Sequence, residues 1–148
     1  MKNWGEHNPA IAADFVARHE GFEPTAYKCP AGVWTIGYGH TAGVKEGDTI
    51  DEVRALELLI ADLASCAREF ARWVNRPVTE GQYIALLSLL YNVGVTYVVH
   101  QCPKLMRALN TRRDGDCAAE FLDIIKADGK VLPGLVKRRQ DEHDLFLS

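Results

Sequence analysis

One stretch interrupts a chain whose apolar residues otherwise recur at helical spacing: residues 20–41, which read EGFEPTAYKCPAGVWTIGYGHT. Gly, Pro, Thr and aromatic residues dominate this stretch, and the helical period disappears. Residues 25–29 and 33–38 have the composition of two short strands, and residues 30–32 between them form a turn sequence. The sequence therefore predicts a β-hairpin in a small lobe of about residues 22–48, within an otherwise helical chain.

The second of these strands is expected to present two different faces, because side chains alternate along a strand with a period of two. One face carries the large side chains Trp34, Ile36 and Tyr38. The other face carries Thr35, Gly37 and Gly39. Because glycine has no side chain, we expect open space on this second face.

A helix is predicted before the hairpin. Asn8 is a suitable N-cap, and Pro9 stands at the first helical position, where a helix tolerates proline best. The helix is expected to end at Glu20, with Gly21 as the residue that follows its last turn. The apolar stripe of this helix consists of Ile11, Ala12, Phe15 and Val16.

Further helices are predicted after the hairpin. Thr49 and Glu52 have the spacing of a capping box for a long helix over about residues 50–74, which we expect to connect two lobes. Thr79 and Gln82 repeat this spacing before a nearly all-apolar helix, the expected core of the larger lobe. That core helix covers residues 83–91 and stops at Gly94. Shorter helices are predicted near residues 103–110, 115–126 and 134–146, with breaks at Gly115 and at Pro133-Gly134.

The composition is that of one compact domain: 148 residues, 47% hydrophobic and 25% charged. A formal charge of −3 argues against a general nucleic-acid binder, which needs a basic surface. No stretch reaches the roughly 18 apolar residues of a membrane span, and residues 1–20 hold no run of signal-peptide length. We therefore expect synthesis in a reducing cytoplasm. The four cysteines lack metal-site spacing and are expected to be mostly reduced and buried: Cys29, Cys66, Cys102 and Cys117.

Glu20 is a candidate acid because it stands at the C-terminal end of a predicted helix. The helix dipole disfavours negative charge there, which favours a carboxyl group that keeps its proton. Burial between the lobes would act in the same direction, and a retained proton is what a general acid needs. On this feature alone, an ordinary structural glutamate is the simpler interpretation.

The residues that follow Glu20 resemble the phage-type lysozymes, the endolysin muramidases of the T4 and P22 kind. That family carries a Glu, then eight residues, an Asp, five residues and a Thr. In this chain Glu20 is followed after eight residues by Cys29, and after five more by Thr35. The spacing of the family is therefore kept, and its Asp is replaced by Cys.

Three later segments extend the resemblance to about residues 10–147: Tyr91-Asn92-Val93-Gly94, residues 105–110, and residues 134–139 followed by Glu142. Four motifs in the family's order imply an α+β, lysozyme-like fold. This fold has a small β-hairpin lobe and a larger helical lobe with a cleft between them, and the resemblance implies a single domain over residues 1–148.

The resemblance also implies roles for six residues. Glu20 would protonate the glycosidic oxygen, Cys29 stands in the place of the anionic partner, and Thr35 would help to hold the attacking water. The cleft would be lined by Gly39, Tyr91 and Asn92. No cofactor and no metal site are implied.

The activity implied by the resemblance is that of an endolysin. Such an enzyme hydrolyses the β-1,4 bond between N-acetylmuramic acid and N-acetylglucosamine in bacterial peptidoglycan, with inversion at the anomeric carbon, and so lyses the host cell. The expected partner is the peptidoglycan glycan strand, and we expect a monomer with no nucleic acid and no membrane insertion. The enzyme would leave the host cytoplasm for the cell wall through a separate membrane pore.

Cys29 leaves four interpretations open, because a neutral thiol neither acts as a base nor stabilises developing positive charge. In the first, a thiolate replaces the carboxylate as base or nucleophile, and a nucleophile gives retention instead of inversion. In the second, Glu20 works almost alone, as in the lytic transglycosylases, where the sugar's own 6-hydroxyl attacks. In the third, the chain is a catalytically weak glycan-binding relic. In the fourth, Glu23 or Asp48 supplies the missing carboxylate.

Several other residues carry structural expectations. Trp4 is predicted to be a hydrophobic anchor, and Trp34 and Trp73 are predicted to lie in the core rather than to form platforms for sugars. His40 is expected to pack against, or bond to, the region that links the lobes.

Arg138 and Arg139 have two interpretations. They would either form an ion pair near Glu20 or belong to a solvated basic face.

Overall fold

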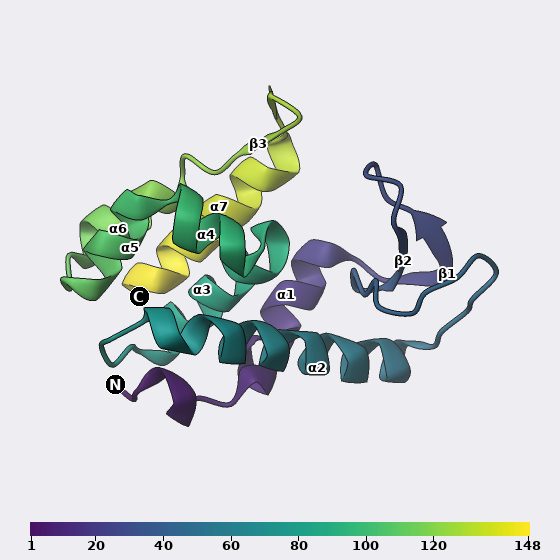
Figure 1. Cartoon of the computed structure of the whole chain (residues 1–148), viewed down its shortest axis with the longest axis horizontal. Helices are drawn as coiled ribbons and strands as arrows, with labels where there is room; N and C mark the ends of the chain where they lie inside the picture. The colour runs from purple at the N-terminus through teal and green to yellow at the C-terminus, as the bar shows by residue number, and fades with distance from the viewer. The chain divides into compact units, whose positions relative to one another are not determined.

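The structure, a computed structural model, describes residues 1–148 and divides into two compact units. Residues 9–65 form the first, here called the hairpin unit. Residues 1–8 together with residues 66–148 form the second, the helical unit. Figure 1 follows the chain from its purple N-terminus to the yellow C-terminal helix.

The hairpin unit contains the predicted β-hairpin. Strands β1 (Glu23–Lys28) and β2 (Trp34–Gly37) pair antiparallel, with Tyr27 opposite Thr35 and Lys28 opposite Trp34. Their register shifts once, between Glu23 and Tyr27. The elements of the unit are η2 (Pro9–Ala12), α1 (Ala13–Glu20), β1 (Glu23–Lys28), β2 (Trp34–Gly37) and the greater part of α2 (Glu52–Phe70).

The first helix ends where the sequence predicts and begins differently. Residues 9–12 form a 3₁₀ turn, and the α-helix proper follows Ala12 rather than Asn8. Short 3₁₀ turns are frequent at helix N-termini, and sequence spacing does not distinguish them from α-helix. At the other end, Gly21 has φ 75° and donates its N–H to the carbonyl of Ala17 at 3.0 Å. A residue with positive φ at this position favours glycine, which confirms the predicted end.

The open space expected beside β2 is not present. Thr35 and Gly37 are both buried. A Cβ atom on Gly37 would lie 3.1 Å from the Cβ of Ala55 in α2. Helix α2 therefore fills the side of the strand that lacks side chains, and the glycine at position 37 allows this close approach.

The long helix α2 starts from a different cap than the one predicted. The carboxylate of Asp51 accepts the backbone N–H of Arg54 at 2.8 Å, so Asp51 satisfies the first turn. Thr49 instead pairs with Thr25 in an isolated β-bridge. The helix continues to Phe70 and is followed by η3 (Ala71–Trp73), close to the predicted end.

The helical unit is built around α3. Its predicted capping box is confirmed: the Thr79 hydroxyl accepts the Gln82 N–H at 3.1 Å, and the Gln82 side chain accepts the Thr79 N–H at 2.9 Å. The helix is buried on most of its surface and packs extensively against α7, the yellow helix in Figure 1. The elements of this unit are η1 (Trp4–Glu6), the end of α2, η3, α3 (Glu80–Val93), α4 (Val95–Gln101), α5 (Pro103–Asn110), α6 (Asp114–Phe121), β3 (Lys126–Ala127), β4 (Lys130–Val131) and α7 (Pro133–Leu147).

Helix α4 and the short hairpin of β3 and β4 were not predicted. Helix α4 begins directly after Gly94, whose φ of 92° ends α3 as expected, and its β-branched residues give little helix signal. Strands β3 and β4 are joined by Asp128 and Gly129, both with positive φ, as in a two-residue hairpin turn. The predicted breaks are also wrong, because Gly115 lies inside α6 and Pro133 opens α7.

The tryptophans differ in their burial. Trp4 is 4% exposed, donates its indole N–H to the Ala67 carbonyl at 2.8 Å and packs against the ring of Tyr83, so it is the predicted anchor. Trp34 is only half-buried and Trp73 is 37% exposed. The prediction that these two belong to the core is therefore wrong.

All four cysteines are free thiols, as expected for reduced side chains. Only Cys117 is fully buried, so the expectation of burial fails for the other three. None of the helices is long and apolar enough by itself to cross a membrane. Helices α3 and α4 reach the required length and hydropathy only together, and they are bent by 99° where they meet.

Candidate active site

Glu20 is the last residue of α1, and its side chain is half-buried. Two residues of this helix, Ala13 and Val16, are buried. Gly21 then turns the chain, and β1 starts two residues later at Glu23. A packed helix end therefore holds the carboxyl group of Glu20 close to the start of the hairpin.

Cys29 follows the last residue of β1, at the start of the hairpin turn. Its own N–H donates to the Val33 carbonyl at 2.9 Å, and its carbonyl accepts the Gly32 N–H at 2.8 Å. The thiol is half-buried and faces backbone N–H groups of the same turn. Hydrogen bonding to the Val33 backbone, with smaller effects from Ala31, Thr35 and Gly32, lowers the pKa of Cys29 against an opposing effect of desolvation. This turn therefore favours a thiolate.

Thr35 lies in β2, directly opposite Tyr27 of β1, and is 5% exposed. Its hydroxyl donates to the Val33 carbonyl at 3.0 Å. The same hydroxyl is a hydrogen-bond partner of the Cys29 thiolate. Because a hydroxyl has one proton to donate, ionisation of Cys29 can redirect it from the carbonyl to the sulfur.

Tyr27 is affected by the charges of both Glu20 and Cys29. Its phenol is 40% exposed, and burial raises its pKa above the ordinary value. The negative charges of Glu23, Glu20 and Cys29 raise the pKa of Tyr27 further, in that order. Glu20 and Cys29 therefore both lie within electrostatic reach of one phenol.

The other two acids suggested by the sequence have different surroundings. The carboxylate of Asp48 accepts the backbone N–H of Lys45 at 2.8 Å and closes a surface turn. Glu23 is exposed in β1, beside Tyr27. Of the two, only Glu23 contributes to the surroundings of the hairpin site.

Gly39 follows β2 with φ 91° and is half-buried. The next residue, His40, lies with its Nδ1 2.7 Å from the carboxylate of Asp62 in α2 and its Nε2 2.9 Å from the Ala42 carbonyl. Both partners are hydrogen-bond acceptors, and the contact with Asp62 ties the segment after β2 to α2. The expected structural role of His40 as a bond to the long helix is therefore confirmed.

Tyr91 and Asn92 lie in the last turn of α3, in the helical unit, and both are half-buried. The side-chain oxygen of Asn92 accepts a hydrogen bond from Nη2 of Arg139 at 2.8 Å. The position of this amide therefore depends on a residue of α7.

Arg138 and Arg139 are buried, so they do not form the solvated basic face that was one of the two expectations. The Nε atom of Arg139 lies 2.7 Å from the carboxylate of Glu142, and both residues are 0% exposed. Ser88 donates its hydroxyl to the same carboxylate at 2.5 Å and accepts a hydrogen bond from Arg138 at 3.2 Å. Burial raises the pKa of Glu142, while the arginines and Ser88 oppose that effect. The alternative expectation, an ion pair near Glu20, stays a prediction.

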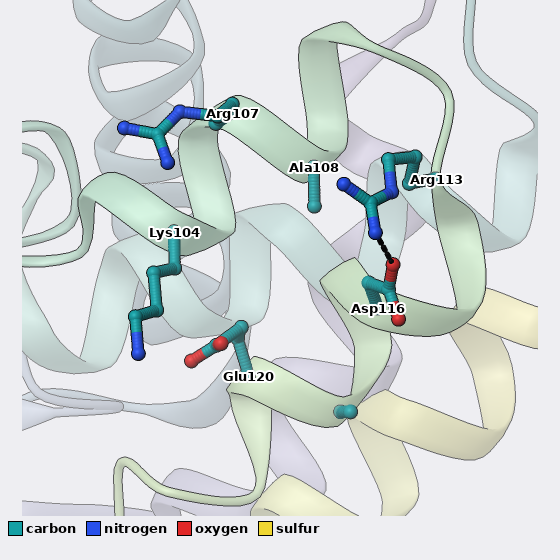
Figure 2. A pocket seen from close by; sticks show the side chains of 7 residues that line it. Lys104, Arg107, Ala108, Arg113, Asp116 and Glu120 are labelled. Carbon is teal, nitrogen blue, oxygen red and sulfur yellow. Dashed lines mark ion pairs between the residues drawn. The ribbon is translucent and has the colours of Figure 1, made fainter.

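Figure 2 shows a different feature of the helical unit, a pocket of about 340 Å³ between α5 and α6. One ion pair lies on one side of it, with Arg113 Nη2 2.8 Å from the Asp116 carboxylate. In the hairpin unit, a pocket of about 320 Å³ is lined by residues that include Ile36 and His40. None of the six residues predicted to act on or bind substrate lines either pocket.

Sequence reasoning missed two features of these sites. Tyr27 was not singled out, although pairing residues across the predicted hairpin would have placed it opposite Thr35. The cluster of Ser88, Arg139 and Glu142 was also missed. The three-residue spacing of Arg139 and Glu142 is visible in the sequence, but their burial depends on the packing of α3 against α7.

Comparisons with known proteins give matches over most of the chain. An endolysin of Acyrthosiphon pisum secondary endosymbiont phage 1 is 39% identical over 137 residues, which cover 90% of this chain and 92% of that protein. The solved structure of the muramidase domain of SpmX from Asticaccaulis excentricus matches with a TM-score of 0.85 and 30% identity, over 93% of this chain and 95% of that one. A mutant of P22 lysozyme matches with a TM-score of 0.79 and 31% identity, over 100% and 99% of the two chains.

The family model described as Phage lysozyme matches residues 17–142. That range includes the end of α1, the whole hairpin and most of α7. It also includes all six residues whose roles the sequence predicted. The chain belongs to the phage lysozyme family.

Proposed function

We propose that this chain is an endolysin that hydrolyses the β-1,4 bond between N-acetylmuramic acid and N-acetylglucosamine in bacterial peptidoglycan and thereby lyses the host cell. Membership of the phage lysozyme family and similarity to proteins named endolysin and muramidase support this activity. The observation that carries the proposal is local. The negative charges of Glu20 and Cys29 both raise the pKa of the Tyr27 phenol, and Cys29 lies in a turn that favours its thiolate.

In the proposed reaction Glu20 is the general acid. Its carboxyl group gives a proton to the glycosidic oxygen while the bond between that oxygen and the anomeric carbon breaks. The transition state has oxocarbenium character, so it needs a nearby negative charge or a nucleophile on the opposite face of the sugar. The half-buried position of Glu20 at a helix end supports a group that is both fixed and accessible.

The Cys29 thiolate supplies the negative charge in this proposal. It takes a proton from a water molecule, and the water oxygen forms the new bond to the anomeric carbon with inversion. The hydroxyl of Thr35, a hydrogen-bond partner of the thiolate, holds that water and the sulfur in line. Exchange with solvent then returns the proton from the thiol and restores the acid form of Glu20.

The glycan strand is proposed to contact Gly39 in the hairpin unit and Tyr91 and Asn92 in the helical unit. An aromatic ring and an amide suit a polymer with apolar sugar faces, hydroxyls and N-acetyl groups. We further propose that the protein is a monomer that reaches the cell wall from the host cytoplasm through a pore made by another protein. Lysis on expression of this chain alone would contradict that route.

The test is product analysis on purified peptidoglycan with three variants. We expect Glu20→Gln to lose at least 100-fold in rate, the usual contribution of a general acid. Cys29→Asp should remain active, because a carboxylate fills the same role. Cys29→Ser should lose about 100-fold, because a serine hydroxyl is not ionised at neutral pH. Proton NMR should show the inverted anomer as the first product.

Three results would overturn parts of the proposal. Full activity of Glu20→Gln removes the acid, and with it the whole mechanism. Full activity of Cys29→Ser removes the thiolate step. Products one water molecule lighter than hydrolysed ends, detected by mass spectrometry, identify attack by the sugar's own hydroxyl and a transglycosylase.

A further inference from the structure

The carboxamide of Asn92 is held by a buried ion pair, and this contact decides which of its atoms a ligand can meet. The oxygen of the amide accepts from Arg139 Nη2 at 2.8 Å. The same Nη2 lies 3.3 Å from Glu142 Oε2, and Arg139 Nε lies 2.7 Å from Glu142 Oε1. One guanidinium group therefore connects a carboxylate in the core to a half-buried amide at the end of α3.

The chemistry of arginine sets the orientation of this amide. A guanidinium group has five N–H donors and no acceptor, so the atom of Asn92 that faces it must be the oxygen. The amide nitrogen, with its two N–H donors, is then left for a partner other than Arg139. Asn92 can therefore donate a hydrogen bond to a ligand, and the ligand must supply the acceptor atom.

The guanidinium group cannot easily swing away from this position. Arg139 and Glu142 are both 0% exposed. The carboxylate is also held by the hydroxyl of Ser88 from α3, and Arg138 lies 3.4 Å from it on α7. Separating a buried ion pair leaves an uncompensated charge in the core, which is costly. The orientation of Asn92 is therefore a built-in property of the packing between α3 and α7.

We propose that Arg139, anchored by Glu142, is a positioning residue for substrate binding. It turns Asn92 so that the amide nitrogen, rather than the oxygen, faces an acceptor oxygen of the glycan and donates one N–H to it. The carbonyl oxygen of an N-acetyl group is the strongest neutral acceptor that such a glycan carries. The inference rests on the proposed function, because it takes the glycan as the ligand of Asn92.

Asn92→Asp is the sharpest variant, because it keeps the acceptor that faces Arg139 and removes the donors. The new carboxylate pairs with the guanidinium, so the melting temperature should stay the same or rise. The probe is a soluble hexasaccharide of alternating N-acetylglucosamine and N-acetylmuramic acid. We expect KM for this probe to rise at least tenfold, with kcat changed less than twofold, as for the loss of one good hydrogen bond.

Arg139→Met combined with Glu142→Met tests the positioning itself. Replacing both partners of a buried pair with apolar side chains of similar size is often neutral for stability. Arg138 loses Glu142 in this variant but keeps its hydrogen bonds to the hydroxyl and the carbonyl of Ser88, so the variant should fold. It should raise KM about as much as Asn92→Leu does, and adding Asn92→Leu to it should raise KM no further. The matched control is Arg76→Met with Asp114→Leu, which removes another ion pair of the helical unit, one that does not contact Asn92. This control should leave KM unchanged.

Two outcomes would overturn the inference. In the first, Asn92→Asp binds the hexasaccharide like the parent chain. In the second, Asn92→Leu raises KM while the Arg139 and Glu142 double variant leaves it unchanged. Calorimetry of hexasaccharide binding in a Glu20→Gln background gives the same comparison without catalysis. Failure of the inference is therefore separate from failure of the proposed reaction, which Glu20→Gln tests on its own.

Discussion

Cys29 and Cys117 show that surroundings, rather than residue type, decide what a thiol can do. Backbone N–H groups of the hairpin turn lower the pKa of Cys29, whereas burial raises the pKa of Cys117 to about 12. The family's spacing of eight residues after Glu20 identifies Cys29 as a candidate site residue in the sequence. The direction of its pKa was not predictable, because the donors around the sulfur depend on the conformation of residues 31–33 and on the position of Thr35.

The difference between the thiols predicts a pH profile of alkylation. The thiolate is the reactive form, so a lowered pKa keeps Cys29 reactive toward iodoacetamide at a pH below the titration of a free cysteine. Cys117 should stay unmodified in the folded protein up to at least pH 10. Thr35→Ser keeps the hydroxyl and should preserve the profile, whereas Thr35→Val should shift it toward higher pH. Peptide mass spectrometry measures each rate, and a Cys29 profile at or above that of free cysteine would refute the account.

At the scale of elements, local signals were predictable and long-range ones were not. The capping box of α3 depends on Thr79 and Gln82 alone, and it was predicted correctly. The sequence predicts Thr49 as the cap of α2. Both Thr49 and Asp51 are suitable capping residues, and only the fold shows that Thr49 pairs with Thr25 while Asp51 caps the helix. The close contact of Gly37 with α2 required knowledge of which helix packs on the hairpin.

Two helical glycines give a matched prediction about packing. A Cβ on Gly81 in α3 would lie 2.6 Å from the backbone carbonyl of Leu145 in α7. Gly81→Ala should therefore destabilise the protein by about 1–3 kcal/mol, despite the better helix propensity of alanine. Gly115→Ala in α6 meets nothing within 4 Å and should stabilise by about 0.5 kcal/mol. Urea unfolding measures both, and equal effects of the two changes would contradict the contact between α3 and α7.

At the scale of the whole molecule, burial changes the charge that a substrate meets. The chain carries 17 basic and 20 acidic side chains. Three arginines, Arg76, Arg138 and Arg139, and one acid, Glu142, are buried. Fourteen basic and nineteen acidic side chains remain outside the core, which gives a surface charge of −5 instead of −3. Sequence counting could not give this value, because nothing local marks an arginine as buried.

A negative surface predicts an unusual response to salt. Peptidoglycan is anionic, so enzyme and wall repel each other at low ionic strength, and salt screens that repulsion. The rate of turbidity loss should rise about twofold between 10 and 100 mM NaCl. The charge-reversed variant Glu69→Lys with Asp123→Lys, changed at two exposed positions, should lose this dependence. If the rate of turbidity loss with the unmodified protein falls with salt over this range, local positive charge outweighs the net negative charge of the surface.

The packing of α3 against α7 also has a consequence for how the chain is made on the ribosome. Helix α3 is complete at residue 93, and the helix that packs against it is complete 54 residues later, at residue 147. At ordinary translation speeds of about 5–20 residues per second, this delay lasts about 3–11 s. For that time a mostly apolar helix lacks the partner helix that it packs against, so the nascent chain exposes a surface that is prone to aggregation.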